Sequence, residues 1–370
     1  MEAPHLSILK EDLAAQDRLL LCAVMILTVW GIFCIYSAGV GRGGGGFALR
    51  QGGWLLLGIV CYISVVAVGY RRLMERAYPI YALTLLLLLL TALLAPRVKG
   101  AQSWLSLGFF RFQPSEFAKI SLLLVLSKSL SRYPPLSLKP FLIGLAVASP
   151  AILLVLAQPD AGSALVYIVI TLGALFAAGA PVRYLASIMG AGIVAAPFLW
   201  LGLKDYQKMR LLVFLDPTRD PLGAGYNVLQ SRIAVGSGGF WGKGFLKGMQ
   251  SKLRFLPEPH TDFIFSVYSE EFGFLGACVL LLLFAIVFHR MITAALRSRD
   301  VRCKVLVAGA VTWIWFQAFE SIGMSIGLLP ITGLPLPFLS YGGSSLLSIF
   351  IALGVVGSIY ADGAQRIRQI

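Results

Sequence analysis

The segment LPEPHTDFIF, residues 256–265, places a glutamate, a histidine and an aspartate within five positions: Glu258, His260 and Asp262. The residues that follow, 263–290, are almost wholly apolar. A carboxylate that is fixed, partly desolvated and open to a substrate can act as a general base. We expect Asp262 to fill this role, because the prolines beside Glu258 direct that side chain along the loop. The alternative is that Asp262 only caps the helix that follows, where a negative charge suits the positive helix end.

Four further ionisable residues stand inside or at the edge of apolar blocks, where charges are costly and indicate functional sites. Glu116 and Lys119, in RFQPSEFAKI, are three positions apart and can pair on one helical face. Two interpretations of this pair are open: a structural ion pair, or a cation that faces a cavity and is held there by the glutamate. Asp160, in AQPDAGSAL, can bind substrate or only cap the next helix. Arg50, in ALRQGGW, can bind substrate or only anchor a span at the membrane interface.

Membrane-spanning helices must position these residues. Of the 370 residues, 58% are hydrophobic and only 13% are charged, against roughly 45–50% and about 25% in ordinary soluble domains. The apolar residues form long blocks, and a helix of about 20 apolar residues crosses the bilayer core of roughly 30 Å. We therefore predict an all-α polytopic integral membrane protein, a single domain over residues 1–370 with about ten transmembrane helices. The predicted spans are 19–39, 48–69, 77–95, 114–130, 140–157, 162–179, 184–202, 263–288, 305–328 and 339–361.

The distribution of positive charge predicts the orientation of these spans. With the N-terminus in the cytoplasm, the cytoplasmic segments hold sixteen Lys or Arg residues and the short outer loops hold five, as the positive-inside rule prefers. An even number of spans then places both termini in the cytoplasm. Residues 203–262 form one large extracytoplasmic loop between the seventh and eighth helices, so Asp262 is expected on the outer face.

The loop 203–262 is basic, with nine Lys or Arg residues against five acidic residues. A solvated loop or a contact with anionic head groups would explain this charge. We favour a site for a phosphorylated, lipid-linked substrate, with Arg210 as a candidate cation from its loop position alone. Within the loop, AVGSGGFWGKG (234–244) lacks residues that a phosphate-binding loop requires, so we interpret it as a flexible glycine-rich loop. Prolines and glycines in 329–343 indicate broken helices.

With these residues identified, the sequence resembles the SEDS family of polytopic bacterial cell-wall polymerases, which act in shape, elongation, division and sporulation. Gln158 before Pro159 and Asp160, and the sequence ITGLPLPF, make the chain most similar to the elongation group of that family, RodA. The resemblance covers nearly the whole chain and rests on five blocks in order: FQPSEFAK (112–119), QPDAGSAL (158–165), NVLQSRIAVGSGGFWGKGF (227–245), FLPEPHTDFIFSVYSEEFG (255–273) and GLLPITGLPLPFLSYGGSS (327–345).

The resemblance implies a peptidoglycan glycosyltransferase of the bacterial inner membrane that serves cell elongation and rod shape. Its substrate would be lipid II, a disaccharide-pentapeptide on undecaprenyl pyrophosphate, presented at the outer leaflet. The essential aspartate of the family aligns with Asp262, and its charged membrane-embedded residues align with Arg50, Glu116, Lys119 and Asp160. The implied partners are a class B penicillin-binding protein, which is a transpeptidase, the elongation machinery and membrane lipids, with no nucleic acid among them.

In the implied reaction, Asp262 accepts the proton of the attacking sugar hydroxyl, and the anomeric centre is inverted. Arg50, Lys119 and Arg210 are the cations expected to stabilise the departing pyrophosphate. A divalent cation, Mg or Mn, is an alternative for this task, although the sequence contains no dedicated metal-ligand cluster. Two other functions stay open: a lipid II flippase that uses the same intramembrane charges, and a non-catalytic scaffold for a transpeptidase. The cluster around Asp262 favours the polymerase.

Overall fold

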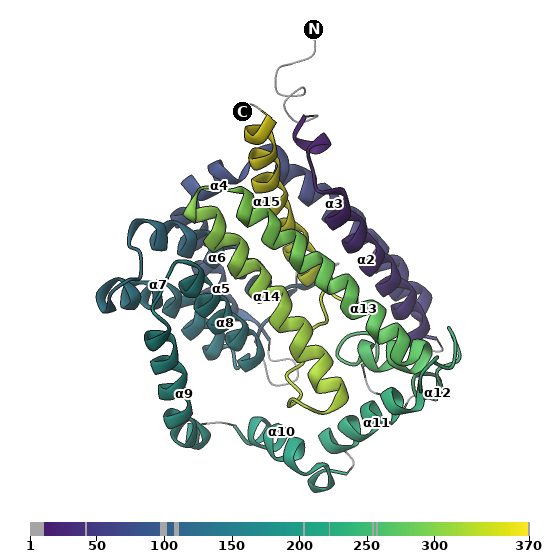
Figure 1. The fold of residues 1–370 in the computed structure, drawn as a ribbon. Coiled ribbons are helices and arrows are strands. Elements are labelled where there is room, and N and C mark those ends of the chain that lie inside the picture. The colour runs from purple at the N-terminus through teal and green to yellow at the C-terminus, as the bar shows by residue number, and fades with distance from the viewer. Residues whose placement is uncertain are drawn as a thin grey trace.

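The computed structural model describes residues 11–40, 43–96, 102–106, 111–202, 204–221, 223–253, 255–256 and 258–368. The described chain is dominated by helices (Figure 1), as expected for an all-α polytopic membrane protein. The charge count made from the sequence also includes five residues outside the described part: Lys10, Arg42, Arg97, Lys99 and Arg254.

Ten long helices coincide with the ten predicted spans. Seven helices of the described chain are long and apolar enough to cross a membrane, and two shorter apolar helices lie in α8 and α9. The ten helices are α2 (Arg18–Ala38), α3 (Gly44–Val68), α5 (Ala77–Leu94), α6 (Pro114–Arg132), α7 (Leu138–Ala157), α8 (Ala161–Ala177), α9 (Val182–Gly202), α13 (Ile264–Arg297), α14 (Val301–Ile326) and α15 (Gly343–Arg368).

Shorter elements connect these helices. Strands β1 and β2 form an antiparallel pair before α6, and the segment 203–262 is largely helical rather than irregular. The short elements are α4 (Tyr70–Glu75), β1 (Leu105–Ser106), β2 (Arg111–Phe112), α10 (Asp205–Leu215), η1 (Pro217–Arg219), α11 (Ala224–Ser237) and α12 (Met249–Lys252).

Helix α13 extends well beyond its predicted span. The sequence predicts a span over 263–288, but α13 continues to Arg297. Its buried face extends through Met291 and Ala294, which are at most 1% exposed, so packing against neighbouring helices maintains the helix where the apolar run has ended. A basic residue in the last turn, Arg297, suits the negative end of the helix.

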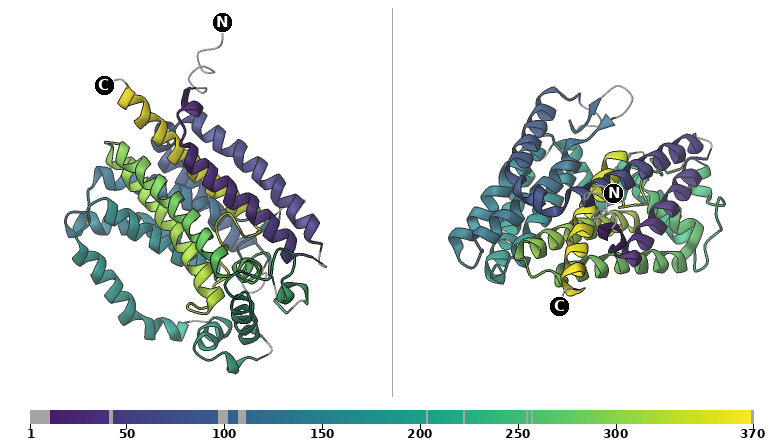
Figure 2. Two further views of the ribbon diagram at one scale, coloured as in Figure 1. Left: turned by 45° about the vertical axis from the view of Figure 1, so that its right-hand side comes forward. Right: turned by 90° about the horizontal axis from the view of Figure 1, so that it is seen from above.

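The centre of the bundle is formed by α6, α14 and α15. Nearly every residue of α6 is buried, which is why this helix can carry serines, a glutamate and a lysine that would be unfavourable against lipid. α15 packs against α3 and α6, and α14 packs against α6 and α8. Seen along the bundle, α15 in yellow lies between the purple helices α2 and α3 and the blue and teal helices α5–α8 (Figure 2).

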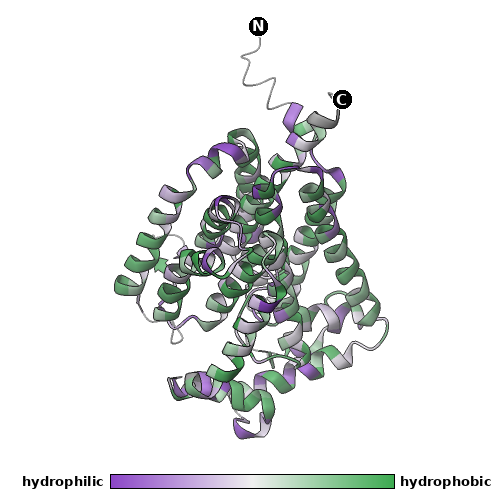
Figure 3. Cartoon of the chain, turned by 60° about the vertical axis from the view of Figure 1, so that its left-hand side comes forward, coloured by the Kyte–Doolittle hydropathy of each residue, from purple (hydrophilic) through white to green (hydrophobic). Residues whose placement is uncertain are grey.

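Polar residues tie the helices together at the end of the bundle that holds both termini. Asp17 caps α2 by accepting from the backbone N–H groups of Leu19 and Leu20, and its other oxygen lies 2.7 Å from Arg290 of α13. Arg71 of α4 pairs with Asp362 of α15 at 2.5 Å. Hydrophilic residues gather at this end and around α10 at the opposite end, whereas the helices between are hydrophobic (Figure 3).

Candidate active site

Asp262 is a half-buried residue in the turn that leads from α12 into α13. Helix α13 begins at Ile264, with Phe263 in the N-cap position and no side-chain hydrogen bond to that cap. Asp262 therefore does not occupy the capping position that offered the simpler explanation for an aspartate here.

The backbone just before Asp262 is fixed by residues that follow α14. The Ser340 hydroxyl donates to the Thr261 carbonyl at 2.7 Å and accepts from the Leu336 N–H at 2.8 Å. The N–H of Tyr341 donates to the His260 carbonyl at 2.9 Å. The turn is thus held against the connection between α14 and α15, the proline- and glycine-rich segment that the sequence marks as non-helical.

The His260 ring packs between two aromatic side chains. It stacks on Phe47 of α3, with ring centres 4.4 Å apart and an interplanar angle of 20°. The Tyr341 ring lies edge-on to it at 5.7 Å. His260 therefore anchors the turn through its ring faces, which supports the choice of Asp262 rather than His260 as the reacting group.

Gly333 forms the backbone surface that faces Asp262. A Cβ atom added at Gly333 would lie 3.7 Å from Oδ2 of Asp262, and the φ of +80° at this position favours glycine. The preceding residue, Thr332, donates its hydroxyl hydrogen bond to Glu320 of α14. Thr332 also contacts the start of α8, where a Cβ at Gly162 would be 3.3 Å from the Thr332 Cβ.

Asp160 is the N-cap of α8, which is one of the two roles that the sequence leaves open for it. Its Oδ1 accepts from the Ser163 N–H at 2.9 Å, and its Oδ2 accepts from the Ser163 hydroxyl at 2.8 Å and the Ser103 hydroxyl at 3.3 Å. Gly162, two residues after Asp160, contacts Thr332, and the next residue, Gly333, faces Asp262. The structure thus brings Asp160 and Asp262 to one region.

Glu116 and Lys119 form a buried ion pair in α6. Lys119 Nζ lies 2.6 Å from Glu116 Oε1, and the two side chains are 0% and 3% exposed. The Ser348 hydroxyl donates to the other glutamate oxygen at 3.2 Å, and the ammonium lies 5.0 Å from the ring centre of Trp313. This burial is what the structural interpretation of the pair requires.

Arg50 and Arg210 occupy different surroundings. Arg50 is exposed on α3, next to Gln51. Gln51 is fully buried, accepts from the Gly342 N–H at 3.2 Å and donates to the Ser340 carbonyl at 3.3 Å, which ties this part of α3 to the segment that holds the Asp262 turn. Arg210 is half-buried on α10, which packs against α11 and η1.

The glycine-rich segment 238–244 packs against a break in α13 rather than forming a free loop. At Gly273 the backbone of α13 leaves the helical conformation, with φ 63° and ψ −162°. The carbonyls of Glu270 and Glu271 accept from the N–H groups of Lys243 and Gly244 at 3.0 and 2.9 Å, and Phe274 and Leu275 donate to the carbonyls of Gly239 and Phe240 at 2.9 and 3.1 Å. The prediction of a flexible loop is therefore wrong, because the segment supplies the hydrogen bonds that the broken helix lacks.

Two buried acidic residues at this break were not identified from the sequence. Glu270 accepts from Lys243 Nζ at 2.7 Å and from the Met249 N–H at 2.8 Å, and Glu271 accepts from the Ser37 hydroxyl and from the Leu246 N–H at 3.1 Å. Glu320 of α14 was also missed. In each case the signal was present, because an acidic residue stands inside a predicted span.

No group of three or more His, Cys, Asp or Glu side chains that could hold a metal ion occurs among the described residues.

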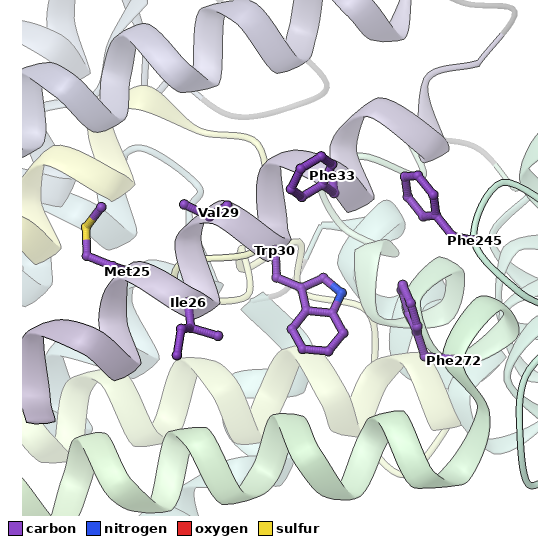
Figure 4. A pocket seen from close by; sticks show the side chains of 7 residues that line it. All are labelled: Met25, Ile26, Val29, Trp30, Phe33, Phe245 and Phe272. Carbon is purple, nitrogen blue, oxygen red and sulfur yellow. The ribbon is translucent and has the colours of Figure 1, made fainter.

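An apolar groove of about 590 Å³ lies between α2 and α13 (Figure 4). Its wall on α2 is formed by aliphatic and aromatic side chains, and Phe272 of α13 and Phe245 close the other side. Trp30 makes an edge contact with Phe272 at 5.4 Å. The groove offers contact to hydrocarbon and almost no polar surface. The residues lining it are Met25, Ile26, Val29, Trp30, Phe33, Phe245 and Phe272.

The long apolar helices define a multi-pass helical membrane protein, in which the turn at Asp262 is held against the connection between α14 and α15. Comparison with known proteins defines its family. The model of the cell cycle protein family that comprises FtsW, RodA and SpoVE matches residues 17–364. The chain belongs to this family.

Several relatives are similar over nearly their whole length. The peptidoglycan glycosyltransferase MrdB of Escherichia coli K12 is 39% identical over 352 residues, which cover 94% of each chain. The peptidoglycan glycosyltransferase RodA of Treponema pallidum is 35% identical, with 93% of this chain and 97% of the relative covered.

Solved structures show the same fold. RodA of Thermus thermophilus, described as a rod shape determining protein, aligns with a TM-score of 0.72 at 30% identity, covering 94% of this chain and 97% of that chain. A chain from a peptidoglycan synthase complex, in which polymerisation and crosslinking are coordinated, aligns with a TM-score of 0.82 at 32% identity, covering 94% of this chain and 98% of that chain.

Proposed function

We propose that this chain joins lipid II units into glycan strands at the outer face of the bacterial cytoplasmic membrane, with Asp262 as the general base. The chain is a peptidoglycan glycosyltransferase, as are the relatives MrdB and RodA by name, and we assign it to cell elongation. One observation carries the role of Asp262. Ser340 and Tyr341 fix its turn, while the carboxylate stays outside the N-cap position of α13.

The proposed reaction is a direct displacement. A sugar hydroxyl of one lipid II attacks the anomeric carbon at the reducing end of the growing strand and transfers its proton to Asp262. The bond from that carbon to the pyrophosphate breaks, and undecaprenyl pyrophosphate departs. General-base assistance of this kind contributes about 10²–10⁴-fold to a rate. A single displacement inverts the anomeric centre, so one carboxylate suffices and no covalent sugar–enzyme intermediate forms.

The departing pyrophosphate needs positive charge. Arg50 is exposed and belongs to the part of α3 that Gln51 ties to the Asp262 region, so we assign it first to this task, with Arg210 as a second cation. Lys119 is fully buried against Glu116 and Trp313. Its contribution in this proposal is to hold α6 in place beneath the site, and Asp160 likewise orders the start of α8.

The same proposal places the protein in a larger assembly. Asp262 would face the periplasm, with both termini in the cytoplasm, in agreement with the positive-inside rule. The structural relative from a complex that coordinates polymerisation and crosslinking supports a class B penicillin-binding protein as partner. Polymer made by one chain would then pass to the transpeptidase that crosslinks it.

Asp262→Asn tests the assignment. The amide keeps the size of the side chain but cannot accept the proton, so polymerisation of fluorescent lipid II, read on a gel, should fall by about 100-fold or more. The melting temperature in detergent should stay within a few degrees of the native value. Asp216→Asn is the matched control, because Asp216 is an acidic residue of the same outer segment that caps η1. Native-like polymerisation by Asp262→Asn would refute the base assignment.

A further inference from the structure

Glu320 is a buried carboxyl group in the membrane helix α14 that the proposed reaction does not use. Its side chain is 2% exposed. One carboxyl oxygen accepts the hydrogen bond of Thr332, whereas Oε2 is buried and has no hydrogen-bond partner among the described residues. Burying a carboxyl group with an unfilled acceptor costs free energy, and acidic residues inside membrane helices indicate a functional task.

Glu320 connects through one residue to the backbone beside Asp262. Glu320 accepts the hydrogen bond of Thr332, and Gly333 follows Thr332 directly. A Cβ atom added at Gly333 would lie 3.7 Å from Asp262 Oδ2. On the other side, Thr332 packs so closely on Gly162 that a Cβ there would be 3.3 Å away. Glu320 is also close enough to Asp262 for their charges to interact.

We infer that Glu320 and Thr332 are positioning residues, which hold the backbone of Gly333 in register with the Asp262 carboxylate. Neither residue acts on substrate in this scheme, because Glu320 is buried and Thr332 donates to it. The segment from 327 to 342 has no regular secondary structure of its own, so a side-chain hydrogen bond from a rigid helix is an effective way to fix it. This inference rests on the proposed role of Asp262.

Four substitutions separate positioning from packing. Thr332→Val removes the hydroxyl and keeps the shape, whereas Thr332→Ser keeps the hydroxyl. Glu320→Leu removes the acceptor, whereas Glu320→Gln keeps an oxygen that can accept from Thr332. Thr28→Val is the matched control, since Thr28 is fully buried and its hydroxyl donates to the Val24 carbonyl one turn earlier in α2 at 2.8 Å.

We expect Thr332→Val and Glu320→Leu to lower kcat for lipid II polymerisation by about 100-fold, the loss that a misplacement of about 1 Å can cause. KM should change by less than about 3-fold, since the proposal removes alignment rather than a contact with substrate. Thr332→Ser and Glu320→Gln should keep kcat within about 5-fold of the native value. All four variants and Thr28→Val should melt in detergent near the native temperature.

Several outcomes would overturn the inference. A native kcat in Thr332→Val would do so, as would equal losses in Thr332→Val and Thr332→Ser, because the hydroxyl would then be irrelevant. If the loss of kcat in each variant matches its fraction of unfolded protein, Thr332 and Glu320 contribute only to packing. Asp262→Asn, measured in parallel, separates the two proposals. If that variant is inactive and Thr332→Val is native-like, only the positioning role fails; if it polymerises normally, the base assignment itself fails.

Discussion

Lys119→Met is expected to destabilise the protein by about 5 kcal/mol, the upper end of the range for removing one partner of a buried ion pair. The ammonium lies 2.6 Å from Glu116 and 5.0 Å from the Trp313 ring centre. Methionine preserves the length of the side chain but leaves the Glu116 carboxylate buried with the Ser348 hydroxyl. The variant also loses the cation–π contact between Lys119 and Trp313, worth about 2 kcal/mol when desolvated. We therefore expect a loss of stability at the upper end of the range.

Glu116→Gln should cost less, about 3 kcal/mol, because Lys119 keeps the Trp313 face and the glutamine oxygen still accepts a hydrogen bond. The double variant should recover to within about 2 kcal/mol of the native protein, since neutral replacement of a buried ion pair is often tolerated. The two substitutions are thus expected to be strongly non-additive, as contacting residues are.

Chemical or thermal unfolding in detergent, followed by tryptophan fluorescence, measures these differences. A double variant as unstable as Lys119→Met, or single variants of native stability, would refute the reasoning from burial. The polymerase activity of the folded double variant then decides between the two interpretations of the pair. Activity near the native rate makes Lys119 structural, and a folded but inactive protein would assign it to the substrate.

Two further predictions concern orientation and the broken helix. The first uses cysteines introduced at the exposed residues Lys252 and Arg299 and a membrane-impermeant thiol reagent, applied to whole cells with a permeabilised outer membrane. Lys252→Cys should be labelled and Arg299→Cys should not. The reverse pattern would place Asp262 in the cytoplasm. Gly242→Ala should destabilise the protein by about 1–3 kcal/mol, because φ is +81° there and a Cβ would clash with the Glu271 carbonyl. Gly236→Ala, in open space within α11, should be neutral or stabilising by up to about 1 kcal/mol, and equal effects in unfolding experiments would contradict the proposed packing of the segment.

The long helices were predictable because the bilayer imposes a length and a composition on every crossing helix. Even α6, whose mean hydropathy is lowered by serines and charges, was found from its apolar residues between Pro114 and Arg132. The extension of α13 was not predictable, since Met291 and Ala294 are buried by other helices rather than by any local pattern.

Some features of the candidate site follow from the local sequence, and others depend on the tertiary fold. Capping by Asp160 is a local property and follows from the sequence around it. The link from Glu320 to Asp262 combines a hydrogen bond between residues 12 positions apart, Glu320 and Thr332, with the contact of Gly333 and Asp262, which are 71 positions apart, and no short motif encodes it. The acidic residues Glu270, Glu271 and Glu320 could have been noticed as charges within spans, but their partners depend on the tertiary fold.

The hydrogen bonds across the break in α13 limit where residues can be inserted into or deleted from the chain. The hydrogen bonds between 239–244 and 270–275 pair backbone groups in a fixed register, so one inserted or deleted residue in either segment would leave buried polar groups unpaired. The turn around η1, which connects α10 to α11, carries no such constraint with α13. Insertions in homologous chains should therefore accumulate before α11 and be absent from 239–244, although both regions belong to the same segment between α9 and α13.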